Sequence, residues 1–166
     1  MTEKEKIYTF LESNCIPYTL YEHPATPTVE MAKVYWAKCA PGVQHCKNIF
    51  MRNHKGDKHY LVIMDCDRTL DTKAFARKIG SSRLSFASDH RLMTYLGVTP
   101  GSVGVFGLLN DKGLAVKLYI DKSLDNSRDI SFHPNDCTAS LVISHDDFLR
   151  VIKLSGHEPE FIDLDS

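Results

Sequence analysis

The chain has 166 residues, of which 43% are hydrophobic, and its 20 Lys and Arg against 21 Asp and Glu give a formal net charge of −1. This length suits one domain with a buried core, since domains most often have about 100–150 residues. The near-neutral charge excludes a global attraction to nucleic acid or to membranes, although a local basic face stays open.

The longest apolar stretches hold only a few residues, far fewer than the roughly 20 that span a bilayer. Since the first residues are also charged, we expect neither a membrane anchor nor a secretory signal. The five cysteines form no C-x-x-C pair, and their odd number does not fit a disulfide framework; they are Cys15, Cys39, Cys46, Cys66 and Cys137. The cysteine content therefore predicts that the protein resides in the reducing cytoplasm.

Residues 4–14 are predicted to form the first helix, because their apolar side chains recur at helical spacing. Thr2 and Glu5 have the spacing of a capping box at its start. Pro17 prevents the helix from continuing, and the β-prone residues 18–21 predict a strand.

A second helix is predicted over residues 29–38, with Thr28 as its cap and the pair Pro41-Gly42 as its exit. Its predicted apolar side consists of Met31, Ala32, Tyr35 and Trp36.

Two β-prone runs, residues 45–52 and 58–65, flank a polar loop of hairpin length and composition. They are the clearest predicted hairpin in the chain. The following elements are a helix at 71–79 ended by Gly80, a short strand at 84–87, and a helix at 88–96 ended by Gly97.

A second hairpin is predicted from the apolar runs 103–109 and 114–120. Strands at 130–132 and 139–143, a helix between Ser144 and Gly156, and a final strand at 161–164 complete the chain. Helices scattered among hairpins predict an α+β fold, one domain over residues 1–166 with a mixed, largely antiparallel sheet and surrounding helices.

Several common chemistries lack their motifs in this sequence. Cys39, His45 and Cys46 have no second cluster at zinc-ligand spacing, so we expect no metal. Cys46 and Cys66 lie in apolar β-runs, where cysteine is usually an inert core residue. Neither a nucleophile elbow nor a glycine-rich nucleotide fingerprint is present.

Three other features have both a structural and a functional interpretation. Residues 97–107 hold four of the nine glycines, so this segment is either a turn or a loop whose N–H groups approach a ligand. Lys47 is either an exposed strand residue or a cation at a pocket mouth, and His133 either caps a strand or points into a cleft. Basic residues that either contact phosphates or are simply solvated are Arg52, His54, Lys55, Lys58, Lys73, Arg77, Lys78 and Arg83.

Four separated motifs, in order, resemble one family. They are His23-Pro24-Ala25 with Thr28-Val29-Glu30, Cys46-Lys47-Asn48-Ile49-Phe50, Gly97-Val98-Thr99-Pro100-Gly101-Ser102-Val103, and Phe132-His133-Pro134. The chain is similar to the bacterial prolyl-tRNA synthetase editing-domain superfamily, above all to its freestanding alanyl-tRNA(Pro) deacylases. The resemblance extends over roughly residues 1–154 and implies a hydrolase that removes a wrongly attached amino acid from tRNA for proline.

The resemblance also implies the site. Lys47 matches the lysine needed for activity, Gly101 opens a loop that holds the 3′ end of the tRNA, and His133 matches a pocket histidine. Backbone N–H groups of the loop, including Ser102 and Gly104, would stabilise the oxyanion while water attacks the ester, with no metal or cofactor. A synthetase site for proline cannot strongly reject a smaller amino acid, so a second pocket is needed, and helical periodicity places Met31 and Val34 in its wall.

The sequence departs from the family pattern at two places: Val105 stands where the loop has proline, and Cys137 stands where an asparagine is expected. Two alternatives therefore remain open. One is a non-catalytic regulator that senses an amino acid or charged tRNA, and the other is a deacylase for cysteinyl- or seryl-tRNA. The expected partners are aminoacyl-tRNA and, transiently, prolyl-tRNA synthetase, without DNA or a membrane, and the near-neutral charge predicts weak tRNA binding.

Overall fold

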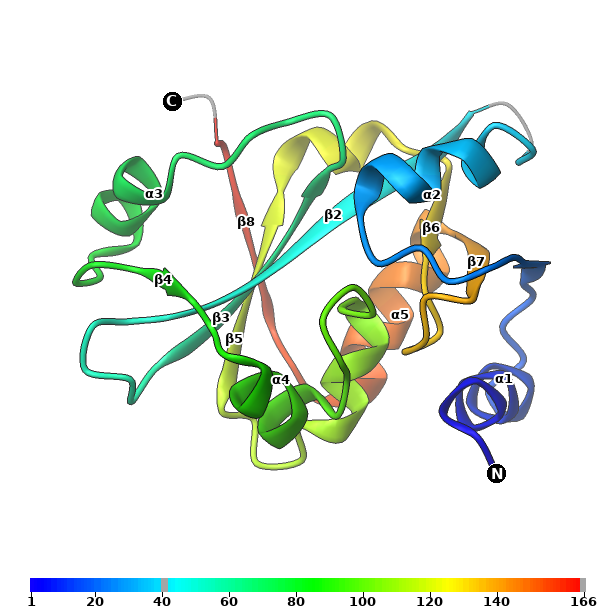
Figure 1. Ribbon diagram of the computed structural model, residues 1–166, viewed down its shortest axis with the longest axis horizontal. Coiled ribbons are helices and arrows are strands. Elements are labelled where there is room, and N and C mark those ends of the chain that lie inside the picture. Colours follow the sequence, from blue (N-terminus) through cyan, green and yellow to red (C-terminus); the bar gives the residue numbers. More distant parts are fainter. Residues whose placement is uncertain (40–41, 165–166) are drawn as a thin grey trace.

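The computed structural model describes residues 1–39 and 42–164, so that Pro41 of the predicted helix exit lies outside the described residues. In chain order (Figure 1), the elements are α1 (Glu3–Ser13), β1 (Thr19–Glu22), α2 (Val29–Trp36), β2 (Val43–Arg52), β3 (His59–Asp65), α3 (Thr72–Ile79), β4 (Ser85–Phe86), α4 (Asp89–Leu96), the 3₁₀ helix η1 (Val105–Asn110), β5 (Val116–Asp121), the 3₁₀ helix η2 (Lys122–Asn126), β6 (Asp129–Phe132), β7 (Ala139–Ser144), α5 (His145–Ser155) and β8 (Pro159–Ile162).

Local capping chemistry sets the helix ends, as predicted. Thr2 and Glu5 form the capping box of α1, and the Thr28 side chain accepts a hydrogen bond from the Met31 N–H at the start of α2. Gly80 and Gly97 end α3 and α4 in the left-handed conformation, which costs glycine little because it has no Cβ.

The strands form one mixed sheet in the order β1-β7-β6-β2-β3-β5-β8, with β4 attached to β2. The pairings of β1 with β7, β2 with β3, β2 with β4 and β6 with β7 are antiparallel. The pairings of β2 with β6, β3 with β5 and β5 with β8 are parallel. The predicted α+β class with a mixed sheet is confirmed, and antiparallel pairings are the more numerous among the described strands.

The sheet forks along β2. On the edge of β2 that faces away from β3, residues 43–45 pair with β6 and residues 51–52 pair with β4. Between them, residues 46–49 have no strand partner on this edge within the part of the chain that the structure describes. The gap lets loops from distant parts of the chain reach the middle of β2.

Both faces of the central strands are covered. On one face Phe50, Leu61 and Leu118 pack in a core with residues of α1, α4, α5 and η1, and on the other Met51 and Val62 pack with α3. This explains why six successive residues of β3 are buried, since a strand between two layers has no solvent face. The layers hold β2 rigidly in place.

The predicted second hairpin is wrong. Residues 105–110 form η1 instead of a strand, and the partners of β5 are β3 and β8. Val105, Phe106 and Leu108 are all buried, and a short apolar run buried on every side carries no periodicity that separates strand from helix. Gly107 permits the close packing, since a Cβ there would lie 3.1 Å from the Leu96 Cβ.

Candidate active site

A cavity of about 180 Å³ lies at the fork beside β2. Four segments line it: residues 26–36 from the loop before α2 and from α2 itself, residues 46–48 of β2, the loop residues Gly101 and Val103, and His133 after β6. Pockets for drug-sized ligands usually measure about 300–1,000 Å³, so this cavity suits a small group. The structure thus brings together Lys47, Gly101 and His133, the three residues that the resemblance marks as catalytic.

Lys47 lies on the open edge of β2 and lines the cavity. Its Nζ donates a hydrogen bond to the Arg68 carbonyl oxygen at 2.5 Å. A lysine ammonium has three donors, so this bond fixes the cation at the cavity while leaving two donors for a ligand.

His133 lines the cavity directly after β6. Its Nδ1 lies 2.6 Å from the Ala139 carbonyl oxygen, and a carbonyl can only accept, so Nδ1 carries the proton. Burial lowers the pKa of His133 below its ordinary value, against the opposing effect of the bond to Ala139. The neutral ring therefore keeps Nε2 as an acceptor.

Gly101 packs against the loop before α2. Its φ is +87°, and a Cβ at this position would lie 2.6 Å from the Cα of Pro27. Both the left-handed backbone and the contact require glycine. The N–H groups of Gly101 and Val103 have no hydrogen-bond acceptor within residues 1–39 and 42–164, and both residues line the cavity.

Ser102 is buried, and the structure places it beside the cavity wall instead of in the lining. Its Oγ accepts a hydrogen bond from the Cys137 N–H at 3.1 Å. The Thr26 N–H and hydroxyl both donate to the Cys137 carbonyl oxygen, at 3.0 and 3.1 Å. The backbone N–H and carbonyl of Cys137 thus tie three cavity loops together, and any residue at this position supplies these two groups.

Three other residues that the sequence marked for substrate binding also lie outside the lining. Gly104 is buried in extended backbone behind His133. Met31 and Val34 are 47% and 66% exposed, because α2 turns Ala32 inward and Val29 and Trp36 flank the cavity on the same face. Val29 and Trp36 lie at i−3 and i+4 from Ala32 and so share its face of the helix, whereas Met31 and Val34 face solvent.

Sequence reasoning missed Asn48. It lines the cavity, and its Oδ1 is buried with no hydrogen-bond partner in the described structure. An unmet buried acceptor costs about 1–3 kcal/mol, so a ligand donor that reaches this oxygen gains affinity. The signal was an asparagine, a residue depleted in strands, in the middle of a β-run.

The five cysteines are free, and the buried Cys46 and the half-buried Cys66 are poor nucleophiles. Burial raises the pKa of the Cys46 thiol and raises that of Cys66 to about 11. Cys66 also belongs to the one group in the described chain with metal-ligand spacing, Asp65-Cys66-Asp67. Asp67 already pairs with Lys33 at 2.9 Å and donates its N–H to Asp65, so these groups are engaged within the protein.

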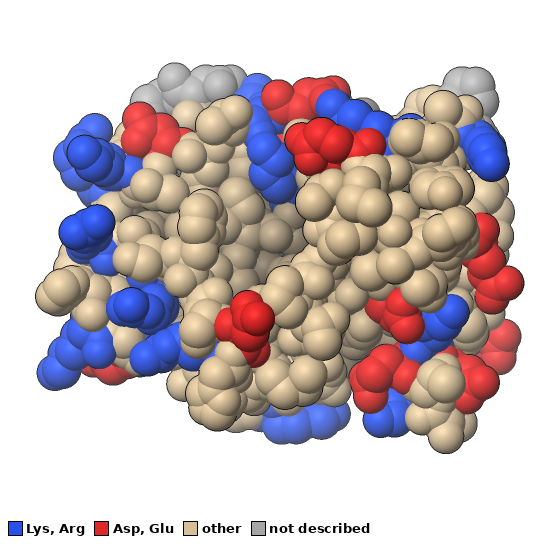
Figure 2. Space-filling view, viewed as in Figure 1, with Lys and Arg blue, Asp and Glu red and all other residues tan. Residues whose placement is uncertain are grey.

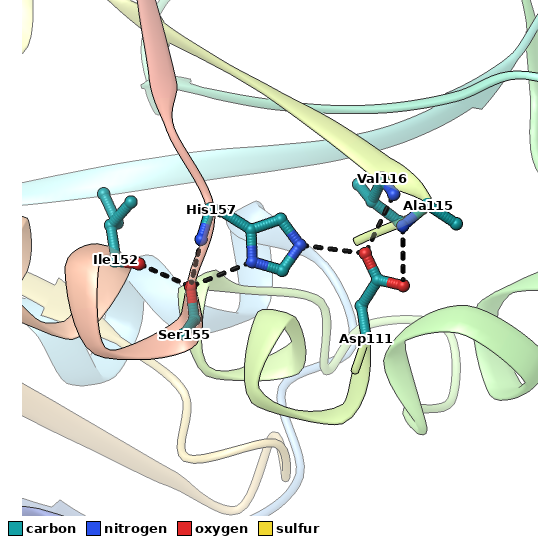
Figure 3. A network of polar contacts seen from close by, with 6 residues as sticks. All are labelled: Asp111, Ala115, Val116, Ile152, Ser155 and His157. Atoms are coloured by element: carbon teal, nitrogen blue, oxygen red, sulfur yellow. Dashed lines mark hydrogen bonds and ion pairs between the residues drawn. The ribbon is translucent and has the colours of Figure 1, made fainter. Parts of the chain in front are cut away.

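A serine, a histidine and an aspartate also line up away from the cavity (Figure 3). The His157 ring lies 2.9 Å from the Ser155 Oγ and 2.8 Å from the Asp111 Oδ2. His157 and Asp111 are 7% and 5% exposed, and Asp111 also accepts the N–H groups of Ala115 and Val116. The network fixes the end of α5 to the start of β5.

Comparisons with known proteins identify the family of this chain. The family model for the aminoacyl-tRNA editing domain matches residues 23–151, a range that includes the whole cavity lining. None of the helices in the described residues combines the length and apolar character needed to cross a bilayer.

Prolyl-tRNA editing protein ProX of Acetoanaerobium sticklandii is 39% identical over 165 residues, 99% of both chains. Prolyl-tRNA synthetase associated domain-containing protein 1 of Bos taurus is 31% identical, over 87% of this chain and 85% of its own. A crystal structure whose description assigns it to trans-editing for prolyl tRNA synthetase shares the fold, with a TM-score of 0.72 at 19% identity over 99% of this chain and 97% of its own. From its motifs, its fold and these matches, the chain belongs to the aminoacyl-tRNA editing domain family.

Proposed function

We propose that this protein is a trans-editing aminoacyl-tRNA deacylase that removes alanine from tRNA for proline. The observation that carries the proposal is the convergence of Lys47, Gly101 and His133, from three distant segments, around one small cavity. The printed names of the relatives, which refer to prolyl-tRNA editing and to prolyl-tRNA synthetase, support proline tRNA as the carrier.

The reaction adds water across the ester, so that the amino acid leaves as a carboxylic acid and the ribose hydroxyl of the tRNA is restored. The free N–H groups of Gly101 and Val103 stabilise the oxyanion of the tetrahedral intermediate. His133 Nε2 accepts a hydrogen bond from the attacking water or from the neighbouring ribose hydroxyl. Lys47 binds the terminal ribose and phosphate, and the Asn48 Oδ1 accepts from the α-ammonium group.

Cavity size supports a small aminoacyl group. At about 180 Å³ the cavity holds roughly six waters, each with a share of about 30 Å³ in the liquid. Val29, Ala32 and Trp36 form its wall on α2. A site of this size suits a small aminoacyl group, and sparing of the proline ring, which a second sieve requires, is the outcome that the hydrolysis assay measures.

The test is hydrolysis of tRNA for proline charged separately with alanine, proline, cysteine or serine, by wild type, Lys47→Ala and Lys47→Arg. We expect fast loss of alanine, sparing of proline, and a fall in kcat/KM on the order of 10²–10³-fold for Lys47→Ala. If cysteine or serine is removed faster than alanine, the substrate is cysteinyl- or seryl-tRNA instead of alanyl-tRNA. Full activity of Lys47→Ala would refute the proposed site.

The regulator alternative finds less support. Its motivation was Val105 in place of the loop proline, yet Val105 is fully buried at the start of η1 and lies outside the cavity lining. Multiple turnovers at low enzyme concentration would exclude a regulator, whereas tight binding of charged tRNA without turnover would replace the deacylase.

We further propose that residues 1–166 act as one editing domain in the cytoplasm, without a metal or cofactor. Five free thiols are compatible with that reducing compartment. Prolyl-tRNA synthetase is the proposed transient partner, because it produces the mischarged substrate. Co-purification of the two proteins in the presence of tRNA, compared with its absence, tests this association.

A further inference from the structure

A second concave surface lies beside α3 and the loop that leads from α3 to β4, apart from the cavity at β2. This groove, which we call the α3–β4 groove, has a volume of about 640 Å³ and is lined by hydroxyl and cationic side chains, among them Thr72, Lys73, Arg77, Ser81, Ser82 and Arg83. The three cations are exposed, and none has an ion pair or hydrogen bond among the described residues. Cations without partners are available to an external anion.

The charge of the chain is unevenly distributed. Residues 52–91 contain nine Lys and Arg against five Asp, a net charge of +4, which leaves −5 for the rest of a chain whose total is −1. Figure 2 shows Lys and Arg gathered along the side of the molecule where α3 and the hairpin of β2 and β3 lie, while Asp and Glu are frequent on the opposite side. The near-neutral total therefore hides a local positive field.

The last groove residue, Leu84, is followed in the chain by β4, which reaches β2. β4 pairs with β2 at Met51 and Arg52, and Arg52 lies five residues from Lys47, or about 16 Å at ~3.3 Å per strand residue. Stacked nucleotides rise ~3.4 Å each along one strand, so about five nucleotides cover this distance. Phe86 of β4, directly opposite Met51, is 71% exposed and offers a face on which a base can stack.

We propose that the α3–β4 groove binds backbone phosphates at the end of the tRNA acceptor stem, while the single-stranded 3′ end runs along β2 into the cavity. The proposal rests on the deacylase function. Unpaired cations beside hydroxyls and an exposed aromatic ring favour RNA over an acidic protein segment, because stacking has no counterpart in binding a carboxylate-rich peptide. The groove would supply affinity, and the cavity would supply chemistry.

The test compares two substrates and two triple variants. The groove variant carries Lys73→Glu, Arg77→Glu and Arg83→Glu, and the control carries Lys112→Glu, Arg150→Glu and Lys153→Glu, which changes the same charge at exposed residues elsewhere. The substrates are alanyl-tRNA for proline and a short alanylated CCA fragment that cannot reach the groove. Circular dichroism and thermal unfolding verify that both variants fold.

We expect the groove variant to raise KM for the full tRNA on the order of 10- to 100-fold, with kcat and the fragment reaction unchanged. Its slope of log K against log salt for uncharged tRNA should fall by about 2–3. Phe86→Ala should weaken binding of the full tRNA as well. The control variant should match wild type in each assay.

Four outcomes would overturn the proposal: an unchanged KM for the full tRNA, an equal loss with the fragment, an equal loss in the control, or an unchanged salt slope. If wild type hydrolyses neither substrate, the deacylase function fails instead. In that case, binding of uncharged tRNA by the groove and control variants still tests whether the groove binds RNA. If the groove variant loses binding to prolyl-tRNA synthetase but still binds tRNA, the groove binds a protein partner and the proposal of an RNA ligand is wrong.

Discussion

Replacement of Gly101 by alanine tests whether the cavity depends on the contact between two loops. The residue has φ +87°, and a new Cβ would lie 2.6 Å from the Cα and 2.8 Å from the carbonyl oxygen of Pro27. Because these are backbone atoms, a side-chain rotation cannot relieve the clash. The loop before α2 has to move away from the cavity.

The structure contains a matched control for the backbone strain. Gly42 has nearly the same φ, +88°, but no atom lies within 4 Å of the position of its added Cβ. Gly42→Ala should therefore cost only the left-handed strain, ~1–2 kcal/mol. Gly101→Ala adds the cost of overpacking, ~1–3 kcal/mol, so its total should reach ~2–5 kcal/mol.

Urea unfolding of both variants measures the free energy of unfolding, and single-turnover deacylation of alanyl-tRNA measures the rate of the chemical step at the site. At concentrations of urea where both variants are folded, we expect Gly101→Ala to lose deacylation on the order of 10²-fold, since misplacement of positioning groups by about 1 Å costs that much. Gly42→Ala should keep the wild-type rate. Equal free energies of unfolding, or an active Gly101→Ala protein, would refute the role of this contact.

Three further predictions concern stability and the walls of the site. Burial lowers the pKa of His45 to about 4. The unfolded chain therefore binds the proton more tightly than the folded protein, and the free energy of unfolding falls as the pH drops from 6.5 to 4. At 1.36 kcal/mol per pH unit, reduced because the ring is partly exposed, the loss is ~2 kcal/mol. His45→Phe, which keeps the stack on Trp36 at 4.4 Å, should abolish this loss in urea unfolding at pH 5 and 7. Asp111→Ala leaves the buried His157 ring and the Val116 N–H without their acceptor and should cost about 1–3 kcal/mol by thermal unfolding; an unchanged stability would mean that this network adds little. Val34→Ser, at a side chain 66% exposed, should change the free energy of unfolding by less than about 0.5 kcal/mol and leave kcat/KM unchanged; a large fall in kcat/KM would return Val34 to the substrate pocket.

The helix ends and the first hairpin could be predicted from the sequence because their causes are local. The capping box of Thr2 and Glu5 spans three residues, and Gly80 and Gly97 act within one turn of the helices they end. The loop between β2 and β3 is closed by Asn53, whose side chain accepts the N–H groups of residues 56–58. Such interactions depend on spacing along the chain alone.

The failures have one cause, which is burial imposed by distant segments. Residues 105–110 form a 3₁₀ helix because they lie between α4 and α5, and no local pattern records neighbours on both sides. The face of α2 that meets the cavity is set by β2 and His133, so Met31 and Val34, which helical spacing indicated, lie outside the lining. Asn48 is a candidate because of its position in the structure, where its side-chain oxygen is buried at the cavity with no hydrogen-bond partner among the described residues.

The sequence by itself determined the α+β class, most element boundaries and, through four motifs in register, the family. Only the tertiary structure decided where the candidate site lies, because the sheet forks at residues 46–49 of β2 and loops around residues 26–28, 101–103 and 133 close the gap. A fork depends on which strands pair at each end of β2, and pairing between distant segments is a property of the whole packed chain.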